Sequence, residues 1–259
     1  MAKLRALDFR SADFAPRFYD SDPEGTPTDA VVLLHGTFGS TASHYGLVFP
    51  EIARERRVIG LDFQCTTSVT LEDLVAQVRS LIDGLELQRP HIVGYSLGAV
   101  AAAAFAARHA GQVGRLVLLA GWARTDAHQV LRNDLHQRLR AADEDALREF
   151  VTLSVFSPEF LAGLSPAALK ATKQSVRFSE VGDAQMRLNR QVDILNELAD
   201  ITAETLVLSC TQDAMVPPHH QEQLAQLIPD AHREYLHGGH GIVFEEPDAV
   251  AAAITEFLR

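Results

Sequence analysis

The sequence is poor in cysteine, in basic charge and in long apolar runs, and each shortage excludes a class of protein. Its 259 residues include Cys65 and Cys210 as the only cysteines, too few for a disulfide scaffold. The formal net charge of −11 argues against nucleic acid or an anionic membrane as a partner, because both require a basic surface. The longest apolar run, residues 99–107, is too short to span a bilayer.

Signals for cofactors and for targeting are also missing. No G-x-G-x-x-G or phosphate-loop pattern occurs, so we expect neither a nucleotide nor a redox cofactor. Residues 1–14 mix charged with apolar side chains and lack the apolar stretch of a secretory signal. We therefore expect a cytoplasmic protein that needs no cofactor, and the sequence leaves its oligomeric state open.

Strands alternate with helices along most of the chain. Continuous apolar runs predict strands that are buried on both faces, as in a parallel sheet, at 30–34, 57–61, 91–93, 113–120 and 204–210. Residue types and apolar spacing predict helices at about 45–55, 71–87, 99–107, 219–227 and 247–258. An antiparallel edge pair and a last strand are predicted at 4–10, 16–20 and 233–236. This order indicates an α/β fold with a mostly parallel central sheet flanked by helices.

The strand pattern stops between residues 124 and 197. Amphipathic helices are predicted there at about 125–141, 143–156, 165–178 and 182–198. Asp143 and Ser165 are suited to capping the second and third of these helices. A helical block between two strands of one sheet predicts an inserted helical cap at 124–197, with the core formed by 1–123 and 198–259.

Residues 94–98 fit the pattern G-x-S-x-G, between the strand predicted at 91–93 and the alanine-rich helix at 99–107. A serine at a sharp corner between a buried strand and a helix is typical of a catalytic nucleophile. Gly94 and Gly98 remove Cβ atoms that would crowd such a corner. This setting predicts that Ser96 is a nucleophile.

A serine hydroxyl needs a base that takes its proton and an acid that orients the base. His240 stands among glycines after the last predicted strand, and Asp213 follows the strand predicted at 204–210. Both residues therefore come at the carboxyl end of a strand, in the order expected after such a serine. We predict that Asp213 orients His240, with Asp126, after the strand at 113–120, as the alternative acid.

Attack on an acyl carbon creates an oxyanion that needs two backbone N–H donors. Leu97 follows Ser96 at the start of its helix, where the helix dipole favours negative charge, and is expected to supply one donor. Thr37, in the segment 35–40 after the first central strand, is expected to supply the other, with Phe38 as the alternative.

Motifs at 35–40, 94–98, 213–217 and 239–247 together resemble those of the α/β-hydrolase fold superfamily, over nearly the whole chain. The resemblance implies the α/β-hydrolase fold and a serine hydrolase with the triad Ser96, Asp213 and His240. One loop departs from the family pattern. Similar proteins carry a glycine-rich loop after Asp62 that borders the pocket, whereas residues 62–70 here contain no glycine.

Further side chains are expected near this site. Phe38, Tyr95 and Trp122 are expected to contact the substrate. A set of large apolar residues either lines an acyl pocket or fills the core of the cap: Trp122, Phe150, Val155, Phe156, Phe160 and Phe178.

Four other positions have structural interpretations. His35 is expected to anchor the loop that contains Thr37, Cys65 to form part of the pocket wall, and Cys210 to lie in the core. We expect no metal site at His219, His220 and His237, because no carboxylate or thiol completes a ligand set.

The expected substrate is a small-molecule carboxylic ester, lactone or thioester of small to medium size. A serine nucleophile argues against dehalogenase and epoxide-hydrolase chemistry, which need a carboxylate nucleophile. Three alternatives stay open: C–C bond cleavage or elimination by the same triad, cofactor-free peroxide chemistry, and a ligand sensor that does not turn over substrate.

Overall fold

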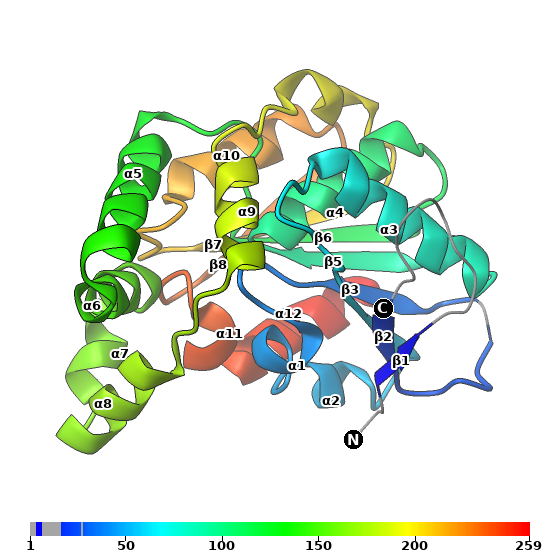
Figure 1. The fold of residues 1–259 in the computed structure, drawn as a ribbon. Coiled ribbons are helices and arrows are strands. Elements are labelled where there is room, and N and C mark those ends of the chain that lie inside the picture. The colour runs from blue at the N-terminus through cyan, green and yellow to red at the C-terminus, as the bar shows by residue number, and fades with distance from the viewer. Residues whose placement is uncertain (1–3, 7–16, 27) are drawn as a thin grey trace.

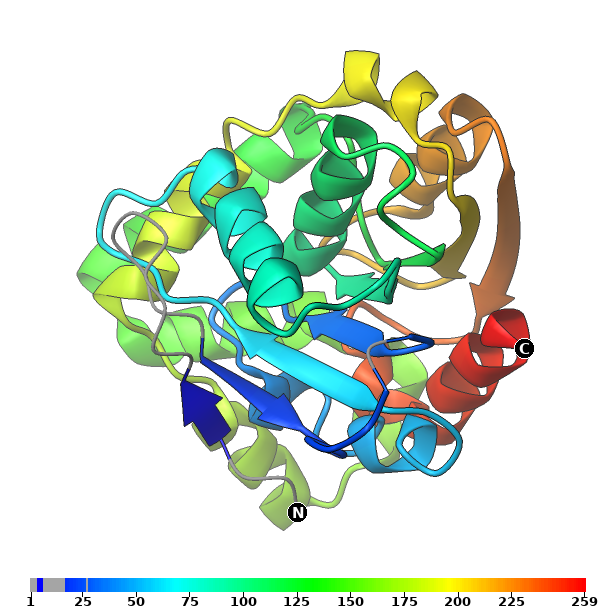
Figure 2. The same ribbon diagram turned by 90° about the vertical axis from the view of Figure 1, so that its right-hand side faces the viewer.

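The computed structural model describes residues 4–6, 17–26 and 28–259. In these residues a sheet of eight strands lies between two layers of helices, as Figures 1 and 2 show from two sides. The strand order is β1-β2-β4-β3-β5-β6-β7-β8, and all pairings from β4 to β8 are parallel. The strands are β1 (Leu4–Ala6), β2 (Arg17–Asp20), β3 (Val31–Leu34), β4 (Val58–Asp62), β5 (His91–Tyr95), β6 (Arg115–Leu119), β7 (Glu204–Cys210) and β8 (Ala231–Leu236).

This topology confirms the predicted mostly parallel α/β fold. β1 and β2 pair antiparallel, as predicted for the edge of the sheet. Residues 7–10 and 16, which the sequence also assigned to these edge strands, lie outside the described residues.

Two helix layers bury both faces of the central strands. One layer contains α3 (Leu71–Gly84), α4 (Leu97–Arg108) and α10 (Pro218–Leu227); the other contains α1 (Thr41–His44), α2 (Phe49–Ile52), α11 (Ile242–Glu245) and α12 (Pro247–Leu258). Leu34 of β3 packs in one core cluster with Leu74 of α3, while Leu33 packs in the other with Ile254 of α12. All four side chains are fully buried, so the strand has no polar face and reads as one apolar run.

The predicted helix at 45–55 is wrong, because two short helices, α1 and α2, occupy this region instead. α1 begins at residue 41 because Ser40 and Ser43 form a capping box, in which each side chain accepts from the other residue's backbone N–H. Pro50 stands in the first turn of α2 and has no N–H with which to continue an earlier helix.

The segment between β6 and β7 is helical, with α5 (Ala127–Ala142), α6 (Glu144–Val155), α7 (Pro158–Gly163), α8 (Pro166–Ser175), α9 (Glu180–Asn189) and a 3-10 helix (Leu195–Asp200). Figure 1 shows α5 to α8 beside the sheet rather than on its two faces. Asp143 and Ser165 cap α6 and α8 as predicted, whereas α7 was not predicted. The division of the chain into a core and a cap at 124–197 stays a prediction.

The predicted helix at 182–198 ends early, at Asn189. The chain after it pairs with the segment that follows β6: Thr125 donates its N–H to the carbonyl of Val192, and Ile194 donates to Ala123. These backbone bonds are incompatible with a continued helix, and periodicity alone does not reveal them.

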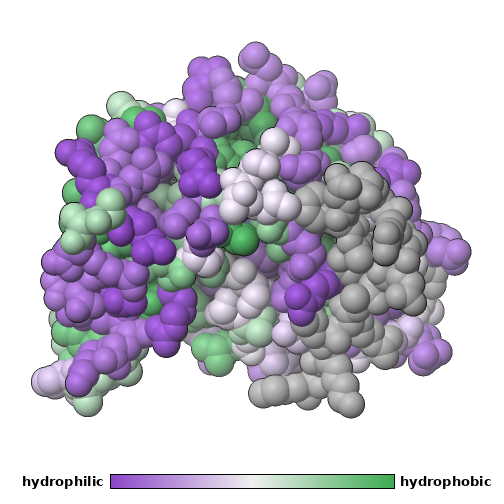
Figure 3. Space-filling model, in the orientation of Figure 1, coloured by the Kyte–Doolittle hydropathy of each residue, from purple (hydrophilic) through white to green (hydrophobic). Residues whose placement is uncertain are grey.

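Among the described residues, no helix combines the length and the apolar composition that crossing a bilayer requires. The face of the molecule drawn in Figure 3 is mainly hydrophilic, and its hydrophobic groups form small separate areas. The apolar side chains are instead gathered in the two core clusters on either side of the sheet.

The corner between β5 and α4 is packed so closely that two of its positions exclude side chains. A Cβ on Gly98 would lie 2.0 Å from the carbonyl oxygen of Leu34, and one on Gly94 would lie 2.3 Å from that of Gly98. Both contacts are with backbone atoms, which cannot rotate away. The two glycines of the G-x-S-x-G pattern are therefore required by packing.

We expect Gly98→Ala to lower the free energy of unfolding by about 3 kcal/mol, because overpacking at this site forces backbone shifts. Gly163→Ala is the matched control, since a Cβ there meets no atom within 4 Å. Its effect should stay within about 0.5 kcal/mol. Urea unfolding, monitored by circular dichroism, measures the stability of both variants. Equal stability of Gly98→Ala and wild type would contradict the close packing.

Candidate active site

Ser96 lies at the corner between β5 and α4 with a backbone φ of 56°. Residues with a side chain rarely adopt this left-handed region, and such strain is commonly found at functional sites. The backbone N–H of Ser96 donates to the carbonyl of Leu119 in β6 at 2.9 Å, which holds the corner against the sheet. The serine is buried and lines a cavity at the edge of the sheet.

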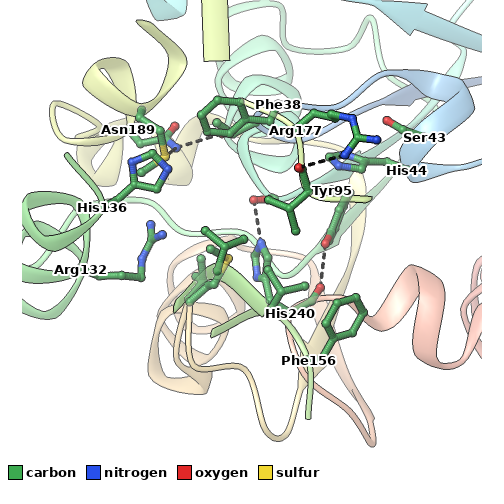
Figure 4. Close-up of a pocket in the computed structure, with 18 of the residues that line it drawn as sticks. Phe38, Ser43, His44, Tyr95, Arg132, His136, Phe156, Arg177, Asn189 and His240 are labelled. Atoms are coloured by element: carbon green, nitrogen blue, oxygen red, sulfur yellow. Dashed lines mark hydrogen bonds between the residues drawn. The ribbon is translucent and has the colours of Figure 1, made fainter. Parts of the chain in front are cut away.

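A chain of hydrogen bonds joins Ser96, His240 and Asp213. The Oγ of Ser96 lies 2.9 Å from Nε2 of His240, and Nδ1 of His240 lies 2.7 Å from Oδ2 of Asp213. Because an ionised carboxylate can only accept, this network assigns the ring hydrogen to Nδ1 and leaves Nε2 free to accept the serine proton. The hydroxyl of Tyr95 donates to the carbonyl of His240 at 2.8 Å and so fixes the loop after β8 (Figure 4).

The carboxylate of Asp213 is fully buried and fixed in orientation. Its Oδ1 accepts the backbone N–H groups of Met215 and Val216, each at 2.8 Å. The alternative acid, Asp126, lies elsewhere: it caps α5, and its Oδ2 is 3.0 Å from Nε2 of His219. The structure therefore brings Asp213, and not Asp126, to His240.

Two backbone N–H groups beside Ser96 have no partner among the described residues, those of Thr37 and Leu97. The N–H of Phe38, the alternative donor, is engaged, because it donates to Oε1 of Gln185 at 2.9 Å. Leu97 is the first residue of α4, where the helix dipole favours an anion. The N–H of Thr37, unlike that of Phe38, is therefore available to donate to an oxygen in the cavity.

α9 holds the loop that contains Thr37. Besides the bond from Phe38 to Gln185, Nδ2 of Asn189 donates to Oγ1 of Thr37 at 2.9 Å. Gln185 and Asn189 are buried, and the sequence analysis missed both. Their spacing of four residues places them on one face of the helix, and this is the signal that could have indicated them.

Two histidines support the same loop from the other side. Nε2 of His35 accepts the N–H of Phe63 at 3.0 Å, so His35 anchors the loop as predicted. Nδ1 of His44, which was not predicted, accepts the N–H of Gly36 at 3.1 Å. Burial, followed by the charges of His35 and His240, lowers the pKa of His44 to about 3, so this ring is neutral near pH 7.

A cavity of about 360 Å³ opens beside Ser96 and His240, a size that suits a small molecule. The three expected contact residues, Phe38, Tyr95 and Trp122, all line it. Figure 4 shows the lining side chains converging on His240 from several elements. Among the set of large apolar residues, those that line the cavity are Trp122, Val155, Phe156 and Phe178.

Two expected lining residues lie outside this cavity. Phe150 does not line it, and neither does Phe160, whose ring stacks on that of Phe156 with 4.8 Å between centroids. The pocket interpretation is therefore right for four of the six residues, whereas Phe150 and Phe160 are half-buried and belong to neither core cluster.

The expectation that Cys65 forms part of the pocket wall is wrong, because no residue of the glycine-free loop 62–70 lines the cavity. α9 lies between this loop and the cavity. Gln185 of α9 donates to Sγ of Cys65 at 3.4 Å, while Asn189 on the same helix lines the cavity. Cys210 is fully buried in the core, as predicted.

The sequence argument against a metal site is wrong in one premise, because a carboxylate does lie beside His219 and His220. One ligand atom from each of these histidines and from Asp126 lies within 4.8 Å of the others. Oδ2 of Asp126 is 3.0 Å from His219 and 3.4 Å from His220, which links the start of α5 to the start of α10. His237 contacts Thr211 instead.

Residues 31–253 match the profile of the alpha/beta hydrolase family. The chain belongs to this family. A pyrrolizixenacetamide deacetylase of Xenorhabdus hominickii is 26% identical over 240 residues, which cover 88% of this chain and 90% of the relative. The family match and this relative identify a hydrolase.

Solved structures agree on the fold of this alpha/beta hydrolase. The enol-lactonase of Burkholderia xenovorans LB400 superposes with a TM-score of 0.81 at 23% identity and covers 99% of both chains. MGS-M2, an alpha/beta hydrolase from a Medee basin deep-sea metagenome library, gives 0.84 at 20% identity and covers 98% of this chain and 96% of its own.

His44→Gln should flatten the dependence of stability on pH. The unfolded chain binds a proton at this position below about pH 6.5, whereas burial lowers the folded pKa to about 3, so stability rises with pH between these values. Glutamine does not titrate, and the slope between pH 5 and 6 should fall by about 1 kcal/mol per pH unit.

Urea unfolding at several pH values measures this slope. His232→Gln, at an exposed side chain, is the control and should leave the slope unchanged. An unaltered slope in His44→Gln would contradict a neutral His44 in the folded protein.

Proposed function

We propose that this alpha/beta hydrolase cleaves a small to medium carboxylic ester, lactone or thioester through an acyl-enzyme intermediate. The observation that carries the proposal is the unbroken hydrogen-bond chain from Ser96 through His240 to Asp213, at the wall of a cavity of about 360 Å³. A serine hydroxyl so connected has both the base and the orienting acid that its activation requires.

The reaction follows from these contacts. As Oγ of Ser96 attacks the acyl carbon, its proton passes to Nε2 of His240, 2.9 Å away. The N–H groups of Thr37 and Leu97 stabilise the oxyanion. When the intermediate collapses, His240 gives the proton to the leaving alcohol or thiol, and an acyl ester on Ser96 remains. In the second half of the reaction His240 takes a proton from water, which attacks the acyl carbon, and then returns a proton to Oγ of Ser96 as the acid leaves.

The helices of segment 124–197 act as a cap in this proposal. α5, α6 and α9 each contribute residues to the cavity lining, including Arg132, Val155 and Asn189. A cavity closed by these helices limits substrate size and excludes water from the developing charge.

Cleavage of an acyl–nitrogen bond is the second candidate, since the curated relative from Xenorhabdus hominickii is named a deacetylase. The same triad and oxyanion donors serve both bonds, and the difference lies in protonation of a poorer leaving group by His240. Assaying anilides beside esters distinguishes the two candidates.

Ser96→Ala should reduce the hydrolysis of p-nitrophenyl esters by about 10⁴-fold or more, because the nucleophile is removed. Rates for acyl chains from acetate to dodecanoate should fall for the longest chains, which exceed the cavity. Circular dichroism checks that the variant is folded. A folded wild type that turns over no ester or anilide would contradict the proposal.

Asp213→Asn and Asp126→Asn form a matched pair that tests the orienting acid. Asp213→Asn should lower kcat by about 10³- to 10⁴-fold, because the amide favours the wrong tautomer of His240. Asp126→Asn keeps a capping side chain and should change kcat less than about twofold. The reverse pattern in steady-state kinetics would assign the role to Asp126.

A further inference from the structure

Arg132 of α5 points into the cavity and has no acidic partner. No hydrogen bond or ion pair engages its guanidinium among the described residues, and its Nε is buried without a partner. Three other arginines of this region form ion pairs, Arg140 and Arg148 with Glu144 and Arg190 with Asp134, and the exposed Arg138 and Arg187 donate to backbone carbonyls. A partly buried cation without a partner is unfavourable in the free protein and suggests that a ligand completes it.

Two neighbouring side chains on the same wall are also incompletely bonded. Nε2 of His136 and Oδ1 of Asn189 are buried without partners, and both residues line the cavity. Figure 4 shows Arg132, His136 and Asn189 on one side of the cavity, with His240 facing them. These polar groups lie together in a lining that is otherwise mostly apolar.

The charge of the cavity is opposite to that of the whole chain. Its lining contains two guanidinium groups, of Arg132 and the more exposed Arg177, and no carboxylate, whereas the chain carries a net charge of −11. The negative charge of Asp213 favours the charged form of Arg132. The oxygens of Asp213 are, however, already bonded to His240 and to two backbone N–H groups. An anion in the cavity would therefore meet no acidic competitor on its wall.

The titration of these groups agrees with this arrangement. Burial lowers the pKa of Arg132 to about 10, so it stays charged at pH 7. Burial, followed by the charge of Arg132, lowers the pKa of His136 to about 4, so this ring is neutral. His136 can then donate one ring N–H to a ligand without adding a second charge.

We propose that the substrate of this hydrolase carries a free carboxylate that binds Arg132 while its scissile carbonyl lies at Ser96. This inference rests on the proposed function and narrows it to esters, lactones or thioesters with a second, ionised acid group. A carboxylate matches the planar guanidinium with two parallel hydrogen bonds. A single arginine in a mostly apolar cavity suits this monoanion better than a phosphate dianion, which is harder to desolvate.

The first test compares p-nitrophenyl hemiglutarate with p-nitrophenyl valerate, which have the same acyl length and differ in charge. Wild type should favour the charged ester by at least about 10-fold in kcat/KM, the effect of one charged hydrogen-bonded pair. Arg132→Met should lower this ratio about 10- to 100-fold, and Arg132→Lys should lower it less. Arg138→Met, on the exposed side of α5, is the control and should leave the ratio unchanged.

Equal kcat/KM in wild type, both for these two esters and for a second pair that carries the charge on the leaving group, would overturn the proposal. A ratio that falls in Arg177→Met but not in Arg132→Met would overturn the assignment to Arg132. O-acetyl-3-hydroxypropionate against ethyl acetate repeats the comparison with the carboxylate on the leaving group, and a preference in either pair supports the proposal.

A binding measurement separates this inference from the proposed esterase function. In Ser96→Ala, calorimetry should detect glutarate binding that weakens at least about 10-fold when Arg132→Met is added. If wild type hydrolyses no ester, the proposed function fails, while glutarate binding through Arg132 would still support the carboxylate site. Absence of glutarate binding, or tighter binding of inorganic phosphate, would overturn it.

Discussion

The distance between Gly98 and the end of β3 determines the geometry of the whole site. With no side chain on Gly98, α4 begins directly against the carbonyl of Leu34, and Ser96 is forced into the turn between strand and helix. Any larger residue would push α4 outward and move the serine away from a base that is held by other strands. The position of Ser96 therefore follows from backbone packing rather than from its own side-chain contacts.

Three parallel strands then bring Ser96, Asp213 and His240 together. β5 ends at the serine, β7 leads to Asp213 and β8 leads to His240, and the carboxyl ends of parallel strands lie at one edge of a sheet. Each loop is secured independently, by backbone N–H groups at Asp213 and by the Tyr95 hydroxyl at His240.

The sequence predicted the parts of the molecule that depend on local pattern. Ser96 and Asp213 follow the apolar buried strands β5 and β7, and His240 follows the edge strand β8, so the place of all three at one end of the sheet could be inferred. Arg132, Gln185 and Asn189 could not, because they lie on helices outside the sheet, where packing decides which face turns inward. The interruption between α1 and α2 and the early end of α9 depend on a capping box and on distant backbone pairing, which periodicity does not detect.

The hydrogen bonds from α9 to the loop that contains Thr37 couple the position of α9 to the geometry beside Ser96. Gln185 and Asn189 hold that loop and belong to α9, which also lines the cavity. In the proposed mechanism, displacing α9 to admit a substrate would break both bonds, so the loop that contains Thr37, the proposed oxyanion donor, would be held less rigidly. Binding energy that returns α9 to its place would restore them. The enzyme would then be least reactive towards water when it is open, and most reactive when its cavity is filled.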